Sequence, residues 1–322
     1  MKHVDAFRAS VFTCSMTDCT LVTCDDVPHL DPDDRLLAEE LVRRGIFVAV
    51  AVWSDESVNW SDTKCCVLRS TWDYYRRFDD FAKWLDRVSQ LTTIWNSPEL
   101  VRWNADKRYL LDLEEAGVRI VPTLWASRGE KFSLVECRER YGFQDMVIKP
   151  SRGAATHDVL LIHGDDDSLA HGQAHLNRLL RGHDALVQPY LDSVMGYGER
   201  ALVFIRGTFS HAVKKKPFDS VLAVRASTTP VVEATPDEIA LVREALSLAP
   251  APSLYARVDL LRDSNGAACV SEVELIEPGL YFGAHPQSVI TFADALEHKL
   301  NGPGLQGRLE NRSSEVSFSE VS

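Results

Sequence analysis

Two apolar runs near the end of the chain carry acidic residues in their interior, which limits what this segment can fold into. Residues 255–279 read as two strands joined by a turn at residues 263–266. Asp259 lies in the first run, and Glu272 and Glu274 lie in the second. Because strand side chains alternate between faces, Glu272 and Glu274 share a face, and strand pairing can bring Asp259 beside them.

Three carboxylates on one sheet face repel one another and are costly to remove from water, so they do not suit an ordinary core. A hard divalent cation resolves this conflict, and oxygen ligands of this kind suit Mg²⁺, which commonly sits between carboxylates and nucleotide phosphates. The segment alone leaves a second interpretation open, in which the acidic face of the hairpin is solvated.

Length and charge narrow the class of protein. A chain of 322 residues suggests about two domains. Its net charge of −12 argues against a general binder of nucleic acid or anionic membranes. The sequence has no run of 18 apolar residues and no signal-peptide core, and its seven cysteines include no CxxC pair. We therefore expect a cytoplasmic protein with reduced thiols.

The front third of the chain alternates between strand and helix patterns, which predicts a small parallel α/β domain. A helix is expected after Asp31, with Pro32 in its first turn and Gly45 at its end. The continuous apolar run at 46–53 predicts a strand buried on both faces. The other strands of this domain are expected at 20–24, 65–68 and 93–95.

The remainder of the chain reads as an α+β region. A helix is expected at 104–116 and a strand at 118–124. Further strands are expected near 146–149, 158–163, 185–191, 199–206 and 208–214, and helices near 167–181, 236–249 and 287–299. We expect an N-terminal extension over 1–18 and a polar, disordered tail over 302–322.

Two segments of this region can contact a nucleotide. The strand over 147–150 ends in Lys149, and the small-residue loop after it can cover phosphates with its backbone N–H groups. An ordinary hairpin is the alternative. In the segment 186–192, Pro189 disfavours a central strand position and suggests an edge strand that offers backbone groups to a purine. The alternative there is a plain strand exit.

Two further segments carry charge suited to anions. The hairpin over 198–217 concentrates positive charge, which indicates either an anion site or a solvated basic patch. Its basic residues are Arg200, Arg206, His211, Lys214, Lys215 and Lys216. The strand over 67–70 runs into polar residues at its carboxyl end, where open α/β sheets bind ligands. Arg69 there suits a substrate carboxylate, whereas Trp72 and Tyr74 suit packing.

The order of these segments resembles that of the ATP-grasp superfamily, which includes glutathione synthetase and the ribosomal-protein glutamate ligases. The resemblance covers about residues 20–300. The stretches NADKRYLLDL, LRSTWDY and ELIEPG are similar to the cycloserine-synthetase branch, whose enzymes are O-ureido-serine cyclo-ligases. The resemblance implies an ATP-grasp fold of class α/β. Its parts would be a pre-ATP-grasp substrate domain over 19–103, a small lid region over 104–191 and a C-terminal subdomain with the metal site over 192–301.

The resemblance also implies roles for individual residues. Those that would bind ATP are Lys107, Lys149, Ser151, Gly153, Gln188, Pro189, Tyr190, Leu191 and Glu199. Those that would hold two Mg²⁺ ions, with Mn²⁺ as an alternative, are Asp259, Glu272 and Glu274. The catalytic cations would be Arg200, Arg257 and Lys214, and the substrate residues would be Arg69, Ser70, Thr71 and Asp73. Two features depart from the family pattern: the loop over 151–156 has a single glycine, and Glu274 stands where many relatives carry Asn.

The implied activity is ATP-dependent C–N bond formation on a small amino-acid-like substrate. Phosphoryl transfer would convert a carboxylate into an acyl phosphate, which a nitrogen then attacks, in a cyclo-ligase within the same molecule. A non-catalytic nucleotide sensor and a small-molecule kinase are the alternatives. The expected partner is the small substrate, with no nucleic acid or membrane, and a homodimer is compatible with the sequence.

Overall fold

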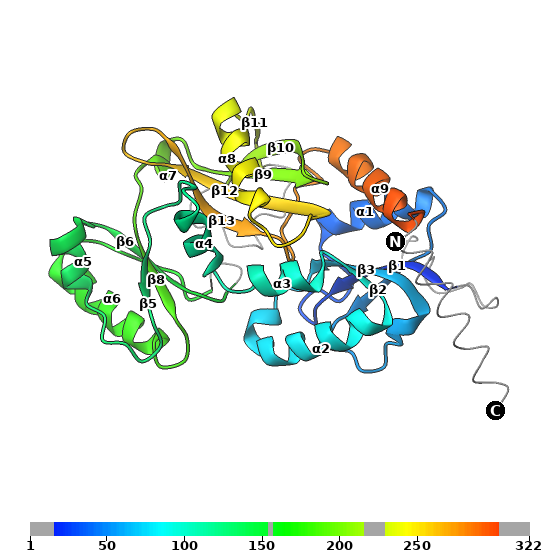
Figure 1. The fold of residues 1–322 in the computed structure, drawn as a ribbon, viewed down its shortest axis with the longest axis horizontal. Coiled ribbons are helices and arrows are strands. Elements are labelled where there is room, and N and C mark those ends of the chain that lie inside the picture. The colour runs from blue at the N-terminus through cyan, green and yellow to red at the C-terminus, as the bar shows by residue number, and fades with distance from the viewer. Residues whose placement is uncertain (1–15, 154–156, 216–228, 303–322) are drawn as a thin grey trace, which may run out of the picture.

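The computed structural model describes residues 16–153, 157–215 and 229–302, and these form three sheets with helices packed around them. In Figure 1 the four-stranded sheet that contains β5, β6 and β8 lies at the left end of the long axis, and the one that contains β1, β2 and β3 lies toward the right. The five-stranded sheet lies between them. No helix in these ranges is long and apolar enough to cross a membrane. The expected extension over 1–18 and tail over 302–322 lie almost wholly outside the described residues.

The first sheet is parallel, with strand order β2-β1-β3-β4, which confirms the predicted α/β domain. Asp31 caps the first helix, since its side chain accepts a hydrogen bond of 2.9 Å from the N–H of Asp33. The elements are β1 (Thr17–Thr23), α1 (Pro32–Arg43), β2 (Val48–Val52), β3 (Thr63–Ser70), α2 (Phe78–Leu91), β4 (Thr93–Trp95) and α3 (Pro98–Asn104).

The prediction that residues 46–53 form a strand buried on both faces is wrong. Strand β2 is the edge of its sheet and is hydrogen-bonded only to β1, and Val50 is exposed. A continuous apolar run indicates a strand but does not by itself show how many neighbours cover it.

The second four-stranded sheet is antiparallel, with order β5-β8-β6-β7, and is covered by α5 and α6. Its strands are β5 (Leu124–Ala126), β6 (Met146–Pro150), β7 (Leu160–Ile162) and β8 (Ala185–Pro189), and its helices are α5 (Leu134–Tyr141) and α6 (Asp166–Leu179). The expectation of an edge strand at Pro189 is wrong, because β8 lies between β5 and β6. Proline fits there because it is the last residue of the strand.

The connection between the first two regions also differs from the prediction. The expected helix over 104–116 is interrupted, since α3 ends at Asn104 and α4 spans Tyr109–Glu115. The expected strand over 118–124 is reduced to an isolated bridge between Ile120 and Val270. The interruption places Lys107 between the two helices, where its backbone N–H donates to the carbonyl of Ser151 at 2.8 Å.

The five-stranded sheet is antiparallel, with order β11-β10-β9-β12-β13. The predicted turn between its last two strands is confirmed, since the N–H of Gly266 donates to the carbonyl of Asp263 at 2.9 Å. The elements are α7 (Ser193–Gly196), β9 (Glu199–Ile205), β10 (Thr208–Lys215), β11 (Val231–Val232), α8 (Pro236–Ser247), β12 (Tyr255–Arg262), β13 (Ala268–Glu274) and α9 (Gln287–Leu300).

The two faces of the five-stranded sheet pack into different cores. Ala201 and Val203 of β9 join the core beneath α1 and α9, whereas Leu202 and Phe204 of the same strand join the core beneath α4 and α8. This alternation decides which polar side chains of the sheet share a face with Asp259, because Asp259 is the register partner of Ala201.

Candidate active site

Three carboxylates gather where β12 and β13 pair. Asp259 is the register partner of Glu272, and Glu274 lies two residues farther along β13 on the same face. One carboxylate oxygen from each of the three residues lies within 4.8 Å of the others. Asp259 is fully buried, and both glutamates are partly buried. The predicted clustering of Asp259, Glu272 and Glu274 is therefore confirmed, and their role as metal ligands stays a prediction.

Two cations neutralise Asp259 directly. Arg257 donates from Nε to Oδ1 at 2.9 Å and from Nη2 to Oδ2 at 3.1 Å. Lys215 donates from Nζ to Oδ2 of Asp259 at 2.7 Å and also lies 2.8 Å from Oε2 of Glu199. Burial alone would raise the pKa of Asp259, but Arg257 and Lys215 lower it to about 2. Asp259 is therefore ionised at neutral pH.

Two more lysines act on Glu272. The Nζ of Lys107 lies 3.1 Å from Oε1 of Glu272 and donates to the carbonyl of Gly153 at 3.0 Å. Lys149, near the end of β6, has a pKa lowered by burial, an effect that the charges of Glu272 and Glu199 oppose. Burial would raise the pKa of Glu272, but Lys107 and Lys149 bring it below its ordinary value. The site is thus a mixed cluster of cations and carboxylates.

Glu274 is the least readily ionised of the three carboxylates. Burial, with repulsion from Asp259 and Glu272, raises its pKa to about 7 although Arg257 contacts its carboxylate and opposes the shift. A divalent cation would remove this repulsion, and three carboxylates whose oxygens lie this close form the hard oxygen donor set that Mg²⁺ prefers. The residues present therefore fit Mg²⁺.

The predicted catalytic role of Arg200 does not agree with the structure. Arg200 precedes Ala201, the β9 residue that pairs with Asp259, so the side chain of Arg200 projects to the opposite face of the sheet. There its Nη1 lies 3.3 Å from Oε2 of the buried Glu238 and donates to the carbonyl of Glu233 at 2.9 Å. Arg200 belongs to the ion pairs beneath α8.

The same one-residue shift separates Lys214 from Lys215. Lys214 projects to the face away from Asp259, where its Nζ donates to the carbonyl of Gly196 at 2.5 Å. The prediction of Lys214 as a catalytic cation is wrong, and Lys215 takes its place beside the carboxylates. The run of three lysines does not reveal which of them faces Asp259 until the register of β10 is known. Lys216 lies outside the described residues.

Some residues near the expected nucleotide site form hydrogen bonds within the protein. The buried side chain of Gln188 donates from Nε2 to Oγ1 of Thr123 at 2.9 Å. The N–H of Tyr190 donates to the carbonyl of Asp145, the residue before β6, at 2.8 Å. Pro189 and Leu191, on either side of Tyr190, are partly exposed. Ser151 is buried, and residues 154–156 of the covering loop lie outside the described residues. Contact of this segment with adenine stays a prediction.

The expectation that Arg69 contacts a substrate carboxylate is wrong, because its side chain has no exposed surface. Its Nε and Nη2 donate to Oδ1 of Asp34 at 2.9 and 2.8 Å. A guanidinium buried this deeply needs a counter-ion, and helix α1 supplies it. Ser70 donates to the other oxygen of Asp34 at 2.6 Å, so this second predicted substrate residue is also used within the protein.

The other two substrate candidates are buried as well. Asp73 accepts from Nε1 of Trp53 at 2.6 Å and from Nη2 of Arg77 at 2.7 Å. Thr71 is fully buried, and its Oγ1 has no hydrogen-bond partner among the described residues. All four candidates at the strand end 69–73 are therefore buried, and none of them presents an exposed charge to a ligand.

A feature that sequence reasoning missed is the segment 275–280, which we call the strap. Each of its six backbone carbonyls accepts a hydrogen bond from a side chain elsewhere in the chain. In order from Leu275 to Leu280, the donors are Asn96, Tyr255, Trp72, Arg69, Arg257 and His211, at 2.7–3.2 Å. The first sheet and the five-stranded sheet thus both fix this segment beside the carboxylates. The sequence did contain a signal for this segment, the ELIEPG stretch at 274–279, but its Glu277 was not predicted as a site residue.

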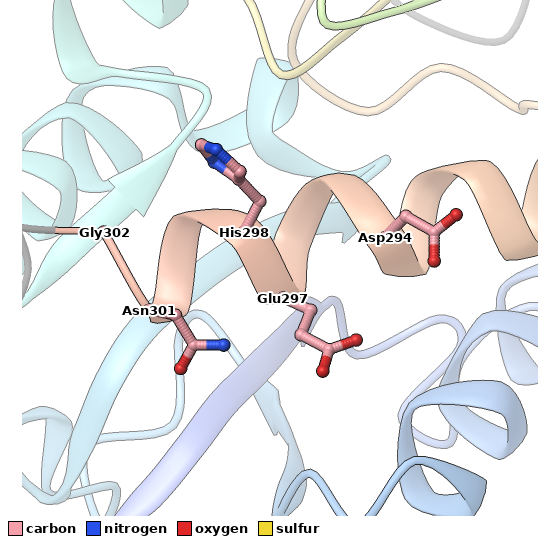
Figure 2. A pocket seen from close by; sticks show the side chains of 5 residues that line it. All are labelled: Asp294, Glu297, His298, Asn301 and Gly302. Atoms are coloured by element: carbon pink, nitrogen blue, oxygen red, sulfur yellow. The ribbon is translucent and has the colours of Figure 1, made fainter.

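A surface hollow of about 450 Å³ lies apart from this cluster, at the C-terminal end of α9. Figure 2 shows that its side chains point in different directions from the helix and do not converge on one point. Two of them, Asp294 and Glu297, are ion-paired with Arg44 of the neighbouring segment at 2.5 and 3.2 Å. The hollow is therefore a junction between helices and holds none of the predicted site residues.

Known proteins match both the sequence and the fold. Residues 19–96 match the family described as D-cycloserine synthetase DcsG, N-terminal domain. The cycloserine biosynthesis protein DcsG of Streptomyces lavendulae is 33% identical over 287 residues, which cover 84% of this chain and 95% of that protein.

Solved structures extend the likeness over most of the chain. The crystal structure of D-cycloserine synthetase DcsG superposes with a TM-score of 0.79 at 32% identity, covering 88% of this chain and 99% of that one. The D-alanine–D-alanine ligase of Bacillus anthracis, solved in complex with ATP, superposes with a TM-score of 0.63 at 14% identity, covering 92% and 99%. The second likeness shows a shared fold alone, and it confirms the predicted α/β architecture of the ATP-grasp type.

Proposed function

The chain belongs to the D-cycloserine synthetase family of ATP-grasp ligases, and from this premise we propose that it uses Mg·ATP to activate the carboxylate of O-ureido-D-serine and closes it into a ring amide. The enzyme is an ATP-dependent ligase. In this proposal residues 19–103 form the substrate domain, 104–191 contain the lid over ATP, and 192–301 carry the metal site.

One observation carries the proposal: the Asp259, Glu272 and Glu274 carboxylates lie together and are bordered by cations from three different regions. A protein that only sensed a nucleotide would have little use for so concentrated a set of metal-ligand carboxylates. Among the residues that the structure describes, Lys107, Lys149 and Lys215 act on this cluster through ammonium groups, and such groups suit phosphate oxygens.

The carboxylates would hold Mg²⁺, two ions in this proposal with Mn²⁺ as a substitute, and the bound metal would withdraw charge from the phosphoryl oxygens. Lys107 and Lys149 bind and orient the ATP phosphates. Arg257 and Lys215 keep Asp259 ionised and stand where negative charge develops on the carboxylate that receives the phosphoryl group. The γ-phosphoryl group passes to a carboxylate oxygen of the substrate, ADP leaves, and an acyl phosphate forms.

Ring closure then needs no nucleophile from the protein. A nitrogen of the same substrate molecule attacks the acyl carbon, the C–N bond forms, phosphate leaves with the bonding electrons of the acyl–oxygen bond, and the nitrogen loses its proton to solvent. Tethering within one molecule supplies much of the effective concentration, so the enzyme mainly has to hold a reactive conformer and exclude water.

Phosphate release from Mg·ATP across a panel of amino acids tests this proposal, with O-ureido-D-serine, O-ureido-L-serine, D-serine and D-alanine in the panel. We expect release with O-ureido-D-serine and a cyclic product by mass spectrometry, and loss of both when Mg²⁺ is chelated. A phosphorylated product that accumulates without a ring would instead identify a kinase. ATP binding without any substrate-dependent release would identify a nucleotide sensor.

A further inference from the structure

A fourth carboxylate, that of Glu277, lies beside the site but outside the metal-ligand group. Glu277 is only 9% exposed. The three carboxylates whose oxygens gather within 4.8 Å do not include it. Within residues 16–153, 157–215 and 229–302, the carboxylate of Glu277 has no hydrogen-bond or ion-pair partner. Its backbone carbonyl does have one, since it accepts a hydrogen bond from the side chain of Trp72.

Burial, and after it repulsion from Glu274 and Glu272, raises the pKa of Glu277 well above its ordinary value. Glu274 and Glu272 act on it with the same sign, and Lys107 and Arg257 act on it with the opposite sign. Both cations have nearer partners, since Lys107 lies 3.1 Å from Glu272 and Arg257 is bound to Asp259. A buried carboxylate left without a counter-ion is destabilising, so its retention here points to a positively charged ligand that is not part of the chain.

The backbone around Glu277 is held in place before any ligand arrives. Trp72 donates from Nε1 to the carbonyl of Glu277 at 3.2 Å. On either side, Tyr255 donates to the carbonyl of Ile276 and Arg69 to that of Pro278, both at 2.9 Å. The backbone that carries this carboxylate is therefore fixed, as a specificity site requires.

We propose that Glu277 binds the α-ammonium group of the amino-acid substrate and thereby selects amino acids over carboxylic acids that lack the amine. This inference rests on the proposed function. In an α-amino acid the ammonium group is two bonds from the carboxyl carbon, so a carboxyl group activated beside the metal carboxylates places its ammonium group next to them. Glu277 follows Glu274 by three residues, and the charges of Glu274 and Glu272 act on it. A substrate without the amine leaves Glu277 unpaired, which penalises its binding.

Glu277→Gln tests the assignment because it keeps the shape and removes the charge. Glu56, which is exposed and far from the strap in sequence, provides the matched control Glu56→Gln. We would measure kcat and KM for O-ureido-D-serine, for its des-amino counterpart 3-(ureidooxy)propanoate and for ATP. Wild type should favour the amino substrate by about 100-fold or more in kcat/KM. Glu277→Gln should raise the KM for the amino substrate, bring this ratio near unity and leave the KM for ATP within about twofold.

A second readout separates this role from a structural one. Removing an unpaired buried charge should raise the melting temperature of the ligand-free enzyme, whereas loss of a structural contact would lower it. Glu277→Asp should retain part of the amine preference, and Glu56→Gln should behave as wild type in every assay. A Glu277→Gln enzyme that keeps the amine preference, or whose KM for ATP rises as much as that for the amino substrate, would overturn the assignment.

Failure of the proposed function gives a different result from failure of this inference. If wild type does not turn over O-ureido-D-serine, the proposed substrate is wrong. Calorimetry with D-serine and with 3-hydroxypropanoate, in the presence of Mg²⁺ and ADP, then decides the role of Glu277. Amine-dependent binding in wild type that is lost in Glu277→Gln supports the inference, and equal binding of the two compounds to wild type overturns it.

Discussion

Lys215 and Lys214 are adjacent in sequence but face opposite sides of the five-stranded sheet, so replacing each by methionine tests the register on which the site depends. Methionine keeps an unbranched apolar side chain and removes the charge. Lys215→Met removes one of the two cations bound to the fully buried Asp259 and also removes the cation paired with Glu199. Breaking a buried ion pair costs about 3 kcal/mol at the lower end of the usual range. We expect this lower value for Lys215→Met because Arg257 still neutralises Asp259.

Lys214→Met removes one hydrogen bond to the carbonyl of Gly196, worth about 1 kcal/mol or less. Urea denaturation followed by tryptophan fluorescence should therefore separate the two variants clearly. Turnover should fall by about 100-fold or more for Lys215→Met and stay within about twofold of wild type for Lys214→Met. A Lys214→Met enzyme that is as destabilised or as inactive as Lys215→Met would refute the register argument.

Three further outcomes are expected. Glu272→Gln should abolish turnover and weaken Mg²⁺ binding while the far-ultraviolet circular dichroism is unchanged; near-normal activity would contradict its assignment as a metal ligand. Arg69→Met should cost about 3 kcal/mol in urea denaturation because it leaves Asp34 buried without its cation, and addition of Asp34→Asn should restore part of the loss. Burial lowers the pKa of His211 to about 4, below its ordinary value near 6.5, so the unfolded chain binds this proton first. Its contribution, about 3 kcal/mol, should be complete above pH 6.5 and lost as the pH falls to 4, and the difference between wild type and His211→Gln should follow that course.

The part of the site that depends on local alternation was predictable from the sequence. Glu272 and Glu274 had to share a face, and the turn ending at Gly266 brought Asp259 opposite them. The choice between Lys214 and Lys215 was not predictable, because it depends on the register of β10 against β9 and β12 and on the shift between Phe209 and His211.

Long-range partners were also beyond reach. Arg69 looked available for a substrate because nothing in its own segment neutralises it, yet Asp34 on α1 does so across the domain. The strap could not be foreseen for the same reason, since its hydrogen-bond donors range from Arg69 to Arg257 in the sequence. Continuous apolar character likewise identified β2 as a strand without showing that it lies at an edge.

The fate of the carboxylate oxygen tests the central claim most directly. O-ureido-D-serine labelled with ¹⁸O at both carboxylate oxygens would be turned over with Mg·ATP, and the released phosphate would be examined by mass spectrometry. An acyl-phosphate intermediate transfers one carboxylate oxygen to phosphate, so each phosphate should carry one ¹⁸O. Ring product accompanied by unlabelled phosphate would contradict activation of the carboxylate by phosphoryl transfer.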